Sequence, residues 1–248
     1  MAAHHPPPAA PGDARPVLFV GDIHGCRSEL ERLLEVAGFR PGDHRLLPVG
    51  DTINRGPDAP GVLDLLRETG AEPLLGNHEL ALLALRGRDA PPNWALRSRS
   101  AWHQLQAAER WERDMAWVAA WPLFREGPGW IAVHAGLHPT LPPARTDPAF
   151  LTEVRFCDAA GRRPEVPERS PTEPPPGFRP WFEHLNGAHA AGRRTVVFGH
   201  WARRGLEVGP GWWGLDTGCV YGRQLTGLWW PEGRLVQVPS AQPPRHAR

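Results

Sequence analysis

Six polar side chains of metal-binding type directly follow five short apolar runs of the chain. They are Asp22, His24, Asp51, Asn77, His134 and His200. Carboxylate, imidazole and amide groups without a thiolate suit hard or borderline divalent cations: we expect Mn first, and Co, Fe, Ni or Zn fit as well. Six such side chains are too many for one catalytic ion that keeps an open coordination position. The set therefore predicts a site for two divalent metal ions that share a bridging carboxylate.

The five apolar runs are the elements that must position these side chains. They cover residues 17–20, 46–49, 74–75, 131–133 and 196–198. Short runs rich in leucine and β-branched residues are typical of buried strands, and an open α/β sheet collects its ligands at the carboxyl ends of its strands. Glycine beside each ligand allows a sharp turn and the close approach of an ion. We therefore expect the six side chains to meet along one edge of a sheet.

Two simpler explanations compete with a catalytic metal site. A single Asp-Gly or Asn-His pair commonly marks a turn, but turn chemistry does not explain ligand types at all five strand ends. A metal site without catalysis is the second alternative. Arg55 and His78 argue against it. Arg55 offers a planar set of donors to phosphate oxygens, and His78 is placed like a general acid that protonates a departing oxygen.

The motifs around these residues resemble those of the calcineurin-like metallophosphoesterases, in the phosphoprotein-phosphatase branch. The matching segments are GDIHG at 21–25, GDTINRG at 50–56 and GNHE at 76–79, followed by His134 and His200. The spacing of 29 residues from Asp22 to Asp51, and of 26 from Asp51 to Asn77, agrees as well. The resemblance runs from about residue 17 to 222. It implies an α/β fold with a central β-sandwich of two mixed sheets flanked by helices.

The same resemblance implies a role for each ligand. Asp22 and His24 would hold the first ion, Asp51 would bridge, and the second ion would be held by Asn77, His134 and His200. A hydroxide that bridges the two ions would then attack phosphorus. The family also has a second arginine between its two late histidines, and Arg155 is our candidate for it.

One position departs from the pattern of the protein Ser/Thr phosphatases. They carry an aspartate where this chain has Asn54, and that aspartate raises the pKa of the catalytic histidine. Asn54 can orient His78 by a hydrogen bond but brings no charge. A departing nucleoside phosphate is a weak base, with a phosphate pKa of roughly 6, and needs little protonation. Asn54 therefore favours a phosphoanhydride substrate over phosphoserine.

The C-terminal third narrows the resemblance within the family. FGHWA at 198–202, GLDTGCVYG at 214–222, and the segments 155–157 and 180–182 resemble the bacterial symmetrical bis(5'-nucleosyl)-tetraphosphatases. Asp216 and Tyr221 lie in the second segment and join Arg55 and Arg155 as candidate substrate-binding residues. The resemblance implies hydrolysis of a dinucleoside polyphosphate, diadenosine tetraphosphate, to two ADP. For some members it also implies removal of dinucleoside-polyphosphate-type caps from 5'-capped RNA. A phosphoprotein phosphatase and a catalytically idle nucleotide-binding module stay open as alternatives.

Composition predicts one intracellular domain. A chain of 248 residues with 41% hydrophobic residues can bury a sizeable core, and a net charge of +1 provides no general field for nucleic acid. Three cysteines without a CxxC pair argue against a disulfide framework. No apolar run suits a membrane span and no signal-peptide pattern is visible. We expect a cytoplasmic protein with no membrane association and no obligate protein partner.

The domain plan has a tail, a single domain and two distinctive segments. We expect residues 1–15 to be disordered and residues 16–240 to form the domain, with helices near 28–37, 62–66 and 79–85. Residues 90–122, with five tryptophans, predict a helical insertion, and residues 164–182, with seven prolines, predict a surface loop beside the cleft. Aromatic side chains of either segment can stack on adenine. Ordinary packing of a helical cap is the alternative, and we favour it for the tryptophans.

Overall fold

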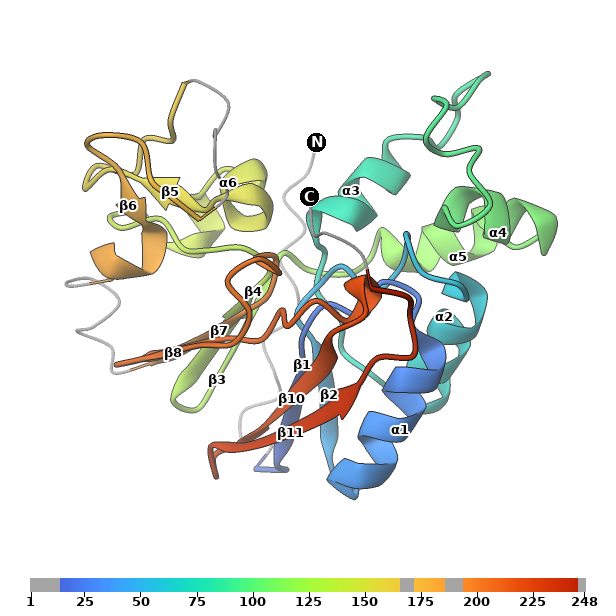
Figure 1. Ribbon diagram of the computed structural model, residues 1–248, viewed down its shortest axis with the longest axis horizontal. Coiled ribbons are helices and arrows are strands. Elements are labelled where there is room, and N and C mark those ends of the chain that lie inside the picture. The colour runs from blue at the N-terminus through green and yellow to red at the C-terminus, as the bar shows by residue number, and fades with distance from the viewer. Residues whose placement is uncertain (1–13, 166–171, 186–193, 245–248) are drawn as a thin grey trace.

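Two mixed β-sheets face each other at the centre of the protein, seen in a computed structural model that describes residues 14–165, 172–185 and 194–244 (Figure 1). The first sheet has the strand order β11-β10-β1-β2, formed by Arg234–Pro239, Gln224–Trp230, Val17–Val20 and Arg45–Pro48. The second has the order β3-β4-β7-β9-β8, formed by Phe124–Gly127, Trp130–Val133, Thr195–Phe198, Trp212–Gly214 and Glu207–Gly209. A two-stranded ribbon joins β5 (Phe156–Cys157) to β6 (Arg179–Pro180). The predicted sandwich of two mixed sheets is confirmed.

The strands that precede the predicted ligands are the parallel ones, but they belong to two sheets. Strands β1 and β2 run parallel in the first sheet, and β4 and β7 run parallel in the second. The expectation of a single sheet edge was therefore wrong, and the ligands gather where the carboxyl ends of two sheets meet. The run at 74–75 is not a strand: the Leu74 N–H donates to Pro48 O and the Leu75 N–H to Pro122 O. Two leucines are too short a run to form a ladder of their own.

The alternation of side chains in β1 shows how the layers are held. Val17 and Phe19 point between the two sheets, whereas Leu18 and Val20 point towards the helices. Phe19 meets Trp130 of the second sheet edge to face, with ring centroids 5.0 Å apart. Both rings are almost fully buried, and each such side chain contributes roughly 1.5–3 kcal/mol by leaving water. This contact ties the two sheets together in the core between them.

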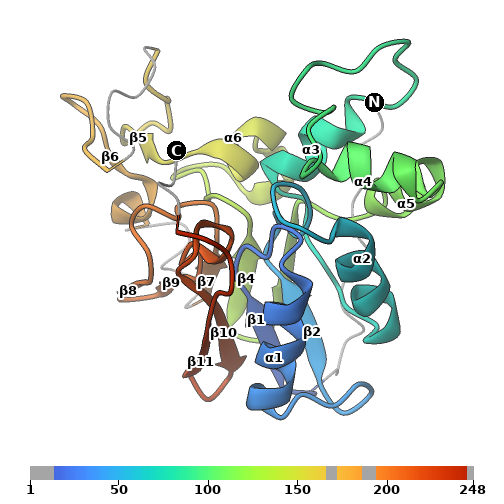
Figure 2. The ribbon, with the colours of Figure 1, turned by 45° about the vertical axis from the view of Figure 1, so that its right-hand side comes forward.

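Helices cover both outer faces of the sandwich. On the side of the first sheet lie α1 (Arg27–Ala37), α2 (Ala59–Glu68), α3 (Asn77–Leu83), α4 (Ala101–Ala107) and α5 (Trp111–Val118) (Figure 2). On the second sheet lie α6 (Pro148–Glu153), η1 (Pro143–Arg145) and η2 (Trp181–His184), and η4 (Cys219–Tyr221) precedes β10. The predicted helix at 28–37 is confirmed as α1, whose Gly38 cap adopts a left-handed φ of 70°. Helix α3 begins two residues earlier than predicted, at the ligand Asn77 itself.

The tryptophans of the insertion pack into the core. Trp111 and Trp121 are buried, and Trp94, Trp102 and Trp117 are partly buried against the same cluster. Helices α4 and α5 occupy this segment.

No described helix is both long enough and apolar enough to span a membrane.

The aromatic end of the predicted proline-rich loop also belongs to the core. Trp181 is fully buried and Phe182 nearly so, and both contact Phe198 of β7. The loop prediction was wrong from residue 179 onward, where β6 and η2 form, because these rings complete the cover of the second sheet. Residues 166–171 of the loop, and 1–13 of the predicted tail, lie outside the described residues.

Candidate metal centre

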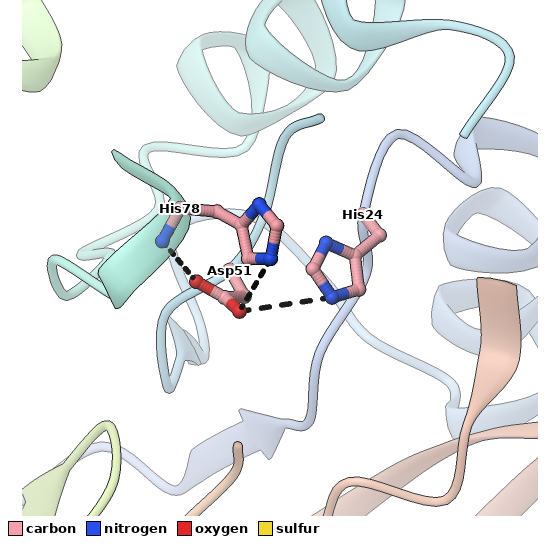
Figure 3. Close-up of side chains that lie close together, drawn as sticks. All are labelled: His24, Asp51 and His78. Carbon is pink, nitrogen blue, oxygen red and sulfur yellow. Dashed lines mark hydrogen bonds and ion pairs between the residues drawn. The ribbon is translucent and has the colours of Figure 1, made fainter. Parts of the chain in front are cut away.

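The Asp51 carboxylate lies close to the imidazoles of His24 and His78 (Figure 3). Its Oδ2 lies 3.7 Å from His24 Nε2, 3.5 Å from His134 Nε2 and 4.0 Å from His78 Nε2. Two groups of potential ligands converge there, one containing His24 and the other His134 and His200, and they share this carboxylate. A shared carboxylate between two ligand groups is the arrangement that can bridge two ions.

The remaining predicted ligands complete both groups. Asp22 Oδ2 lies 3.9 Å from His24 Nε2 on one side. On the other, Asn77 Oδ1 lies 3.1 Å from His134 Nε2 and 3.2 Å from His200 Nδ1. The six side chains come from the ends of β1, β2, β4 and β7 and from the first residue of α3. The fold therefore brings together all six residues that the sequence singled out.

Left-handed backbone conformations concentrate at this site. Positive φ angles occur at His24 (49°), Asp51 (47°), Asn54 (78°), Arg55 (65°) and His200 (68°). Such angles are uncommon outside glycine, and they persist where the surroundings over-determine them. Sharp turns after the strands therefore aim these side chains inward at a cost in backbone strain.

Glycines allow the close approach expected around the ligands. A Cβ at Gly76 would lie 2.2 Å from Asp51 Oδ1, and one at Gly199 would lie 2.1 Å from Asp22 Oδ1. Neither distance is compatible with a side chain. These two positions must be glycine for the carboxylates to lie where they do.

Glu79 supports the site, and the sequence interpretation missed it. Its fully buried carboxylate accepts hydrogen bonds from the backbone N–H groups of Asp51 (2.8 Å), Thr52 (2.9 Å), Ile53 (3.2 Å) and Gly76 (2.8 Å). It thereby joins the GDTIN loop to the GNHE turn. Burial and the neighbouring Asp51 raise the pKa of Glu79 to about 7. The signal in the sequence was a glutamate at the third helical position, where a side chain reaches back to the cap.

Hydrogen bonds to backbone carbonyls orient two of the imidazoles. His134 Nδ1 lies 3.0 Å from Val49 O, and His200 Nε2 lies 3.1 Å from Glu153 O. Each of these nitrogens therefore carries the proton, which leaves His134 Nε2 and His200 Nδ1 with lone pairs facing Asp51 and Asn77. Burial lowers the pKa of His24 to about 3 and that of His200 well below its usual range. Neutral imidazole is the form that binds a metal.

The buried carboxylates supply the negative charge that divalent cations would neutralise. Burial, Asp216 and Asp51 raise the pKa of Asp22 well above its usual range, and burial raises the pKa of Asp216 to about 6. Buried carboxylates this close repel one another, and divalent cations between them would remove that cost. The donor set, the neutral imidazoles of His24 and His200, and the crowded acids therefore fit two metal ions.

His78 lies beside the ligands with both ring nitrogens engaged. Its Nδ1 is 2.9 Å from Asn54 Nδ2, and its Nε2 is 3.0 Å from Arg55 Nε. Asn54 Oδ1 in turn accepts the Ala101 N–H of α4 at 3.1 Å, and Arg55 Nη1 donates to the hydroxyl of Tyr221. Burial lowers the pKa of His78 to about 4, and Arg55 acts in the same direction.

A cleft of about 430 Å³ opens over the centre. The four predicted substrate-binding residues all line it: Arg55, Arg155, Asp216 and Tyr221. Trp201, Ala202 and Arg203 line it as well, and the sequence interpretation assigned them no role. The described lining includes none of the five tryptophans of the insertion.

Comparison with known proteins identifies the fold family. Residues 15–214 match the family model of the calcineurin-like phosphoesterases. This chain belongs to that family. Phosphoesterases of this family use a centre of two metal ions, and the His and Asp groups around Asp51 agree with one.

Two relatives of this phosphoesterase carry the same name. It is 33% identical to the symmetrical bis(5'-nucleosyl)-tetraphosphatase of Aromatoleum aromaticum, across 90% of this chain and 96% of the relative. It is 30% identical to the enzyme of the same name from Edwardsiella ictaluri, across 93% and 98% of the two chains.

Solved structures agree on the fold of the phosphoesterase. The crystal structure of a candidate diadenosine tetraphosphatase matches 92% of this chain and 95% of that one, at 33% identity and a TM-score of 0.73. A cold-active protein-tyrosine phosphatase of a Shewanella species matches at 16% identity and a TM-score of 0.56, over 90% of this chain and 77% of that one. The second likeness concerns the fold alone.

Proposed function

We propose that this phosphoesterase hydrolyses dinucleoside polyphosphates and cuts diadenosine tetraphosphate in the middle to two ADP. Relatives of that name, about one third identical over nearly the whole chain, support the proposal. The observation that carries the choice of substrate is Asn54, which places a neutral amide 2.9 Å from His78 where a carboxylate would serve a phosphoserine enzyme. A phosphoanhydride leaving group needs little protonation, so a neutral partner is sufficient.

The protein groups around the cleft have separate tasks in this reaction. When bound, two divalent cations supply a nucleophilic water at neutral pH and neutralise phosphoryl charge. Arg55 and Arg155 line the cleft beside them and would bind the oxygens of the attacked phosphoryl group. His78 would protonate the departing oxygen, with Asn54 and Arg55 fixing its ring. Tyr221 holds Arg55 from the other side.

Manganese is the ion we propose first, because oxygen and imidazole donors without thiolate suit it; Co, Fe, Ni and Zn fit the same donors. Removal of dinucleoside-polyphosphate caps from RNA would break the same kind of bond. That activity stays a prediction from the shared chemistry.

The test is a comparison of two substrates on the Mn-loaded protein. We expect diadenosine tetraphosphate to yield two ADP and a serine phosphopeptide to release little phosphate. Asp51→Asn, which removes the shared carboxylate, should abolish ADP formation without unfolding the protein. Fast phosphopeptide turnover without ADP would contradict the proposal and favour the phosphatase alternative, and turnover of neither substrate would favour a nucleotide-binding module.

A further inference from the structure

Three arginines line the cleft beside the metal centre, and they differ in exposure. Arg55 and Arg155 are half-buried, whereas Arg203 is exposed. The proposed function assigns the first two to the attacked phosphoryl group. Arg203 contributes a third positive charge to the cleft that this reaction step does not use.

Arg203 lies on a turn that directly follows the ligand His200. Hydrogen bonds from Arg204 N to Trp201 O (2.9 Å) and from Gly205 N to Ala202 O (3.2 Å) form the turn. Arg203 is three positions after His200, so their Cα atoms are at most about 11 Å apart. The backbone of Arg203 is therefore held close to the centre, and its exposed side chain lines the cleft.

Two neighbouring arginines hold this turn, and Arg203 does not take part. Arg204 stacks over the ring of Trp201, 4.9 Å from its centroid, and donates to Glu207 at 2.6 Å. Arg223 donates to Ala202 O at 2.7 Å. Within the described part of the chain, the guanidinium of Arg203 has no hydrogen-bond or ion-pair partner. A rigid turn that presents an uncommitted guanidinium to a cleft is pre-organised for an anion.

The charge of the substrate indicates which anion this is. A bound polyphosphate chain would place its attacked phosphoryl group at the residues that would hold the metal ions, and its further phosphates would extend along the cleft. A guanidinium binds phosphate oxygens in pairs, which suits a rim position beyond the ions. All 28 basic residues of the chain are arginines, so residue type alone carries no weight. Its position in the cleft and the turn that holds it distinguish Arg203 from the other arginines.

We propose that Arg203 is a specificity-determining residue that binds a phosphate group adjacent to the attacked one, so that the site favours polyphosphate chains over substrates with a single phosphate. This inference rests on the proposed function, because it names which part of that substrate Arg203 contacts. It predicts that replacement of Arg203 weakens the binding of a polyphosphate substrate and leaves the binding of a small phosphate ester unchanged.

The kinetic test compares Arg203→Ala with the wild-type Mn-loaded enzyme on two substrates. We expect the KM for diadenosine tetraphosphate to rise about three- to tenfold. This is the range for the loss of one charge-assisted contact that is exposed or partly buried. The kinetic constants for p-nitrophenyl phosphate should stay unchanged. Arg203→Lys should recover part of the loss. Arg32→Ala removes the same charge from the exposed face of α1, outside the cleft, and should leave both substrates unaffected.

An unchanged KM for diadenosine tetraphosphate in Arg203→Ala would overturn the proposal. An equal rise in the KM for p-nitrophenyl phosphate would overturn it as well. A binding measurement separates this outcome from failure of the proposed function. If the wild type does not cleave the dinucleotide, calorimetry with inorganic tripolyphosphate still tests Arg203. Weaker tripolyphosphate binding by Arg203→Ala, with inorganic phosphate bound equally by both proteins, would support the role. Equal tripolyphosphate binding would contradict it.

Discussion

At the residue scale, the chemistry depends on how Asn54 presents its amide to His78. Both nitrogens of His78 face donors, Nδ2 of Asn54 and Nε of Arg55, yet a neutral imidazole carries one proton. Because Asn54 Oδ1 accepts the Ala101 N–H, its NH₂ group must face His78 Nδ1. Nδ1 is then the acceptor for Asn54, and in this structure Nε2 accepts from Arg55 Nε. Nε2 can carry a proton for the departing oxygen only when Arg55 no longer donates to it.

Replacement of Asn54 by aspartate should change the preferred leaving group. A carboxylate at this position can accept from both Ala101 N–H and His78 Nδ1–H, and its charge should raise the pKa of His78. We expect kcat/KM on p-nitrophenyl phosphate to rise relative to diadenosine tetraphosphate. Asn54→Ala, which removes the hydrogen bond without adding charge, should lower both. Unchanged relative rates in Asn54→Asp would refute this role of Asn54.

Glu79→Gln tests the buried carboxylate that ties two ligand-bearing turns together. An NH₂ group in place of one oxygen would face the backbone N–H groups whose hydrogen bonds Glu79 now accepts. These buried N–H donors would then be unpaired. We expect a loss of about 2 kcal/mol in the free energy of unfolding, measured with urea. Mn affinity by calorimetry should fall about tenfold or more, since the turn that carries Asp51 loosens. Glu31→Gln, on the exposed face of α1, is the control: loss of its exposed ion pair with Arg27 should cost less than about 0.5 kcal/mol and leave Mn affinity unchanged.

At the element scale, the sequence predicted where the strands end but not that the strands divide between two sheets. The runs before Asp22, Asp51, His134 and His200 are strands because they are short, apolar and ended by glycine-containing turns. Their division between two sheets depends on pairing over long distances along the chain, which a local pattern does not contain. The burial of Trp181 was missed for a similar reason, because the rings that it contacts, such as Phe198, lie on other elements. Arg203 had no motif of its own, and only the cleft identifies it.

A buried ion cluster joins the insertion to the core and gives an element-scale prediction. Asp114 of α5 is fully buried and accepts from Arg67 of α2 at 2.7 Å and from Arg110 at 2.8 Å. Asp114→Asn removes the buried carboxylate between these guanidinium groups and leaves Asp64 as their remaining countercharge, and we expect a loss of about 2 kcal/mol in unfolding free energy. Arg113→Ala, at a side chain that is 65% exposed, should cost less than about 0.5 kcal/mol. Equal losses in the two variants would show that the cluster contributes no specific stability.

At the scale of the whole molecule, the two sheets are joined twice, by their shared core and by the centre at their ends. The core contact runs through Phe19 and Trp130, and the centre draws Asp51 from the first sheet towards His134 from the second. Ions bound there would hold the sheets together as well as activate water. Global stability should therefore depend on metal.

Metal removal should lower the melting temperature. Ions that bind only the folded chain stabilise it by about 2.7 kcal/mol at a hundredfold excess over Kd. A chelator removes that contribution and leaves Asp22, Asp51 and Asp216 to repel one another. We expect a clear drop in Tm with chelator for the wild type and a smaller one for Asp51→Asn. A wild-type Tm that does not respond to chelator would mean that no ions bind at the junction of the sheets.

Titration of the metal-free protein with Mn²⁺, with turnover of diadenosine tetraphosphate followed at each step, tests the central claim most directly. We predict that two ions bind per chain, that hydrolysis rises with the second, and that the products are two ADP. Full activity at one ion per chain, or in the presence of chelator, would contradict a two-ion centre. Products of AMP and ATP would contradict cleavage in the middle of the substrate.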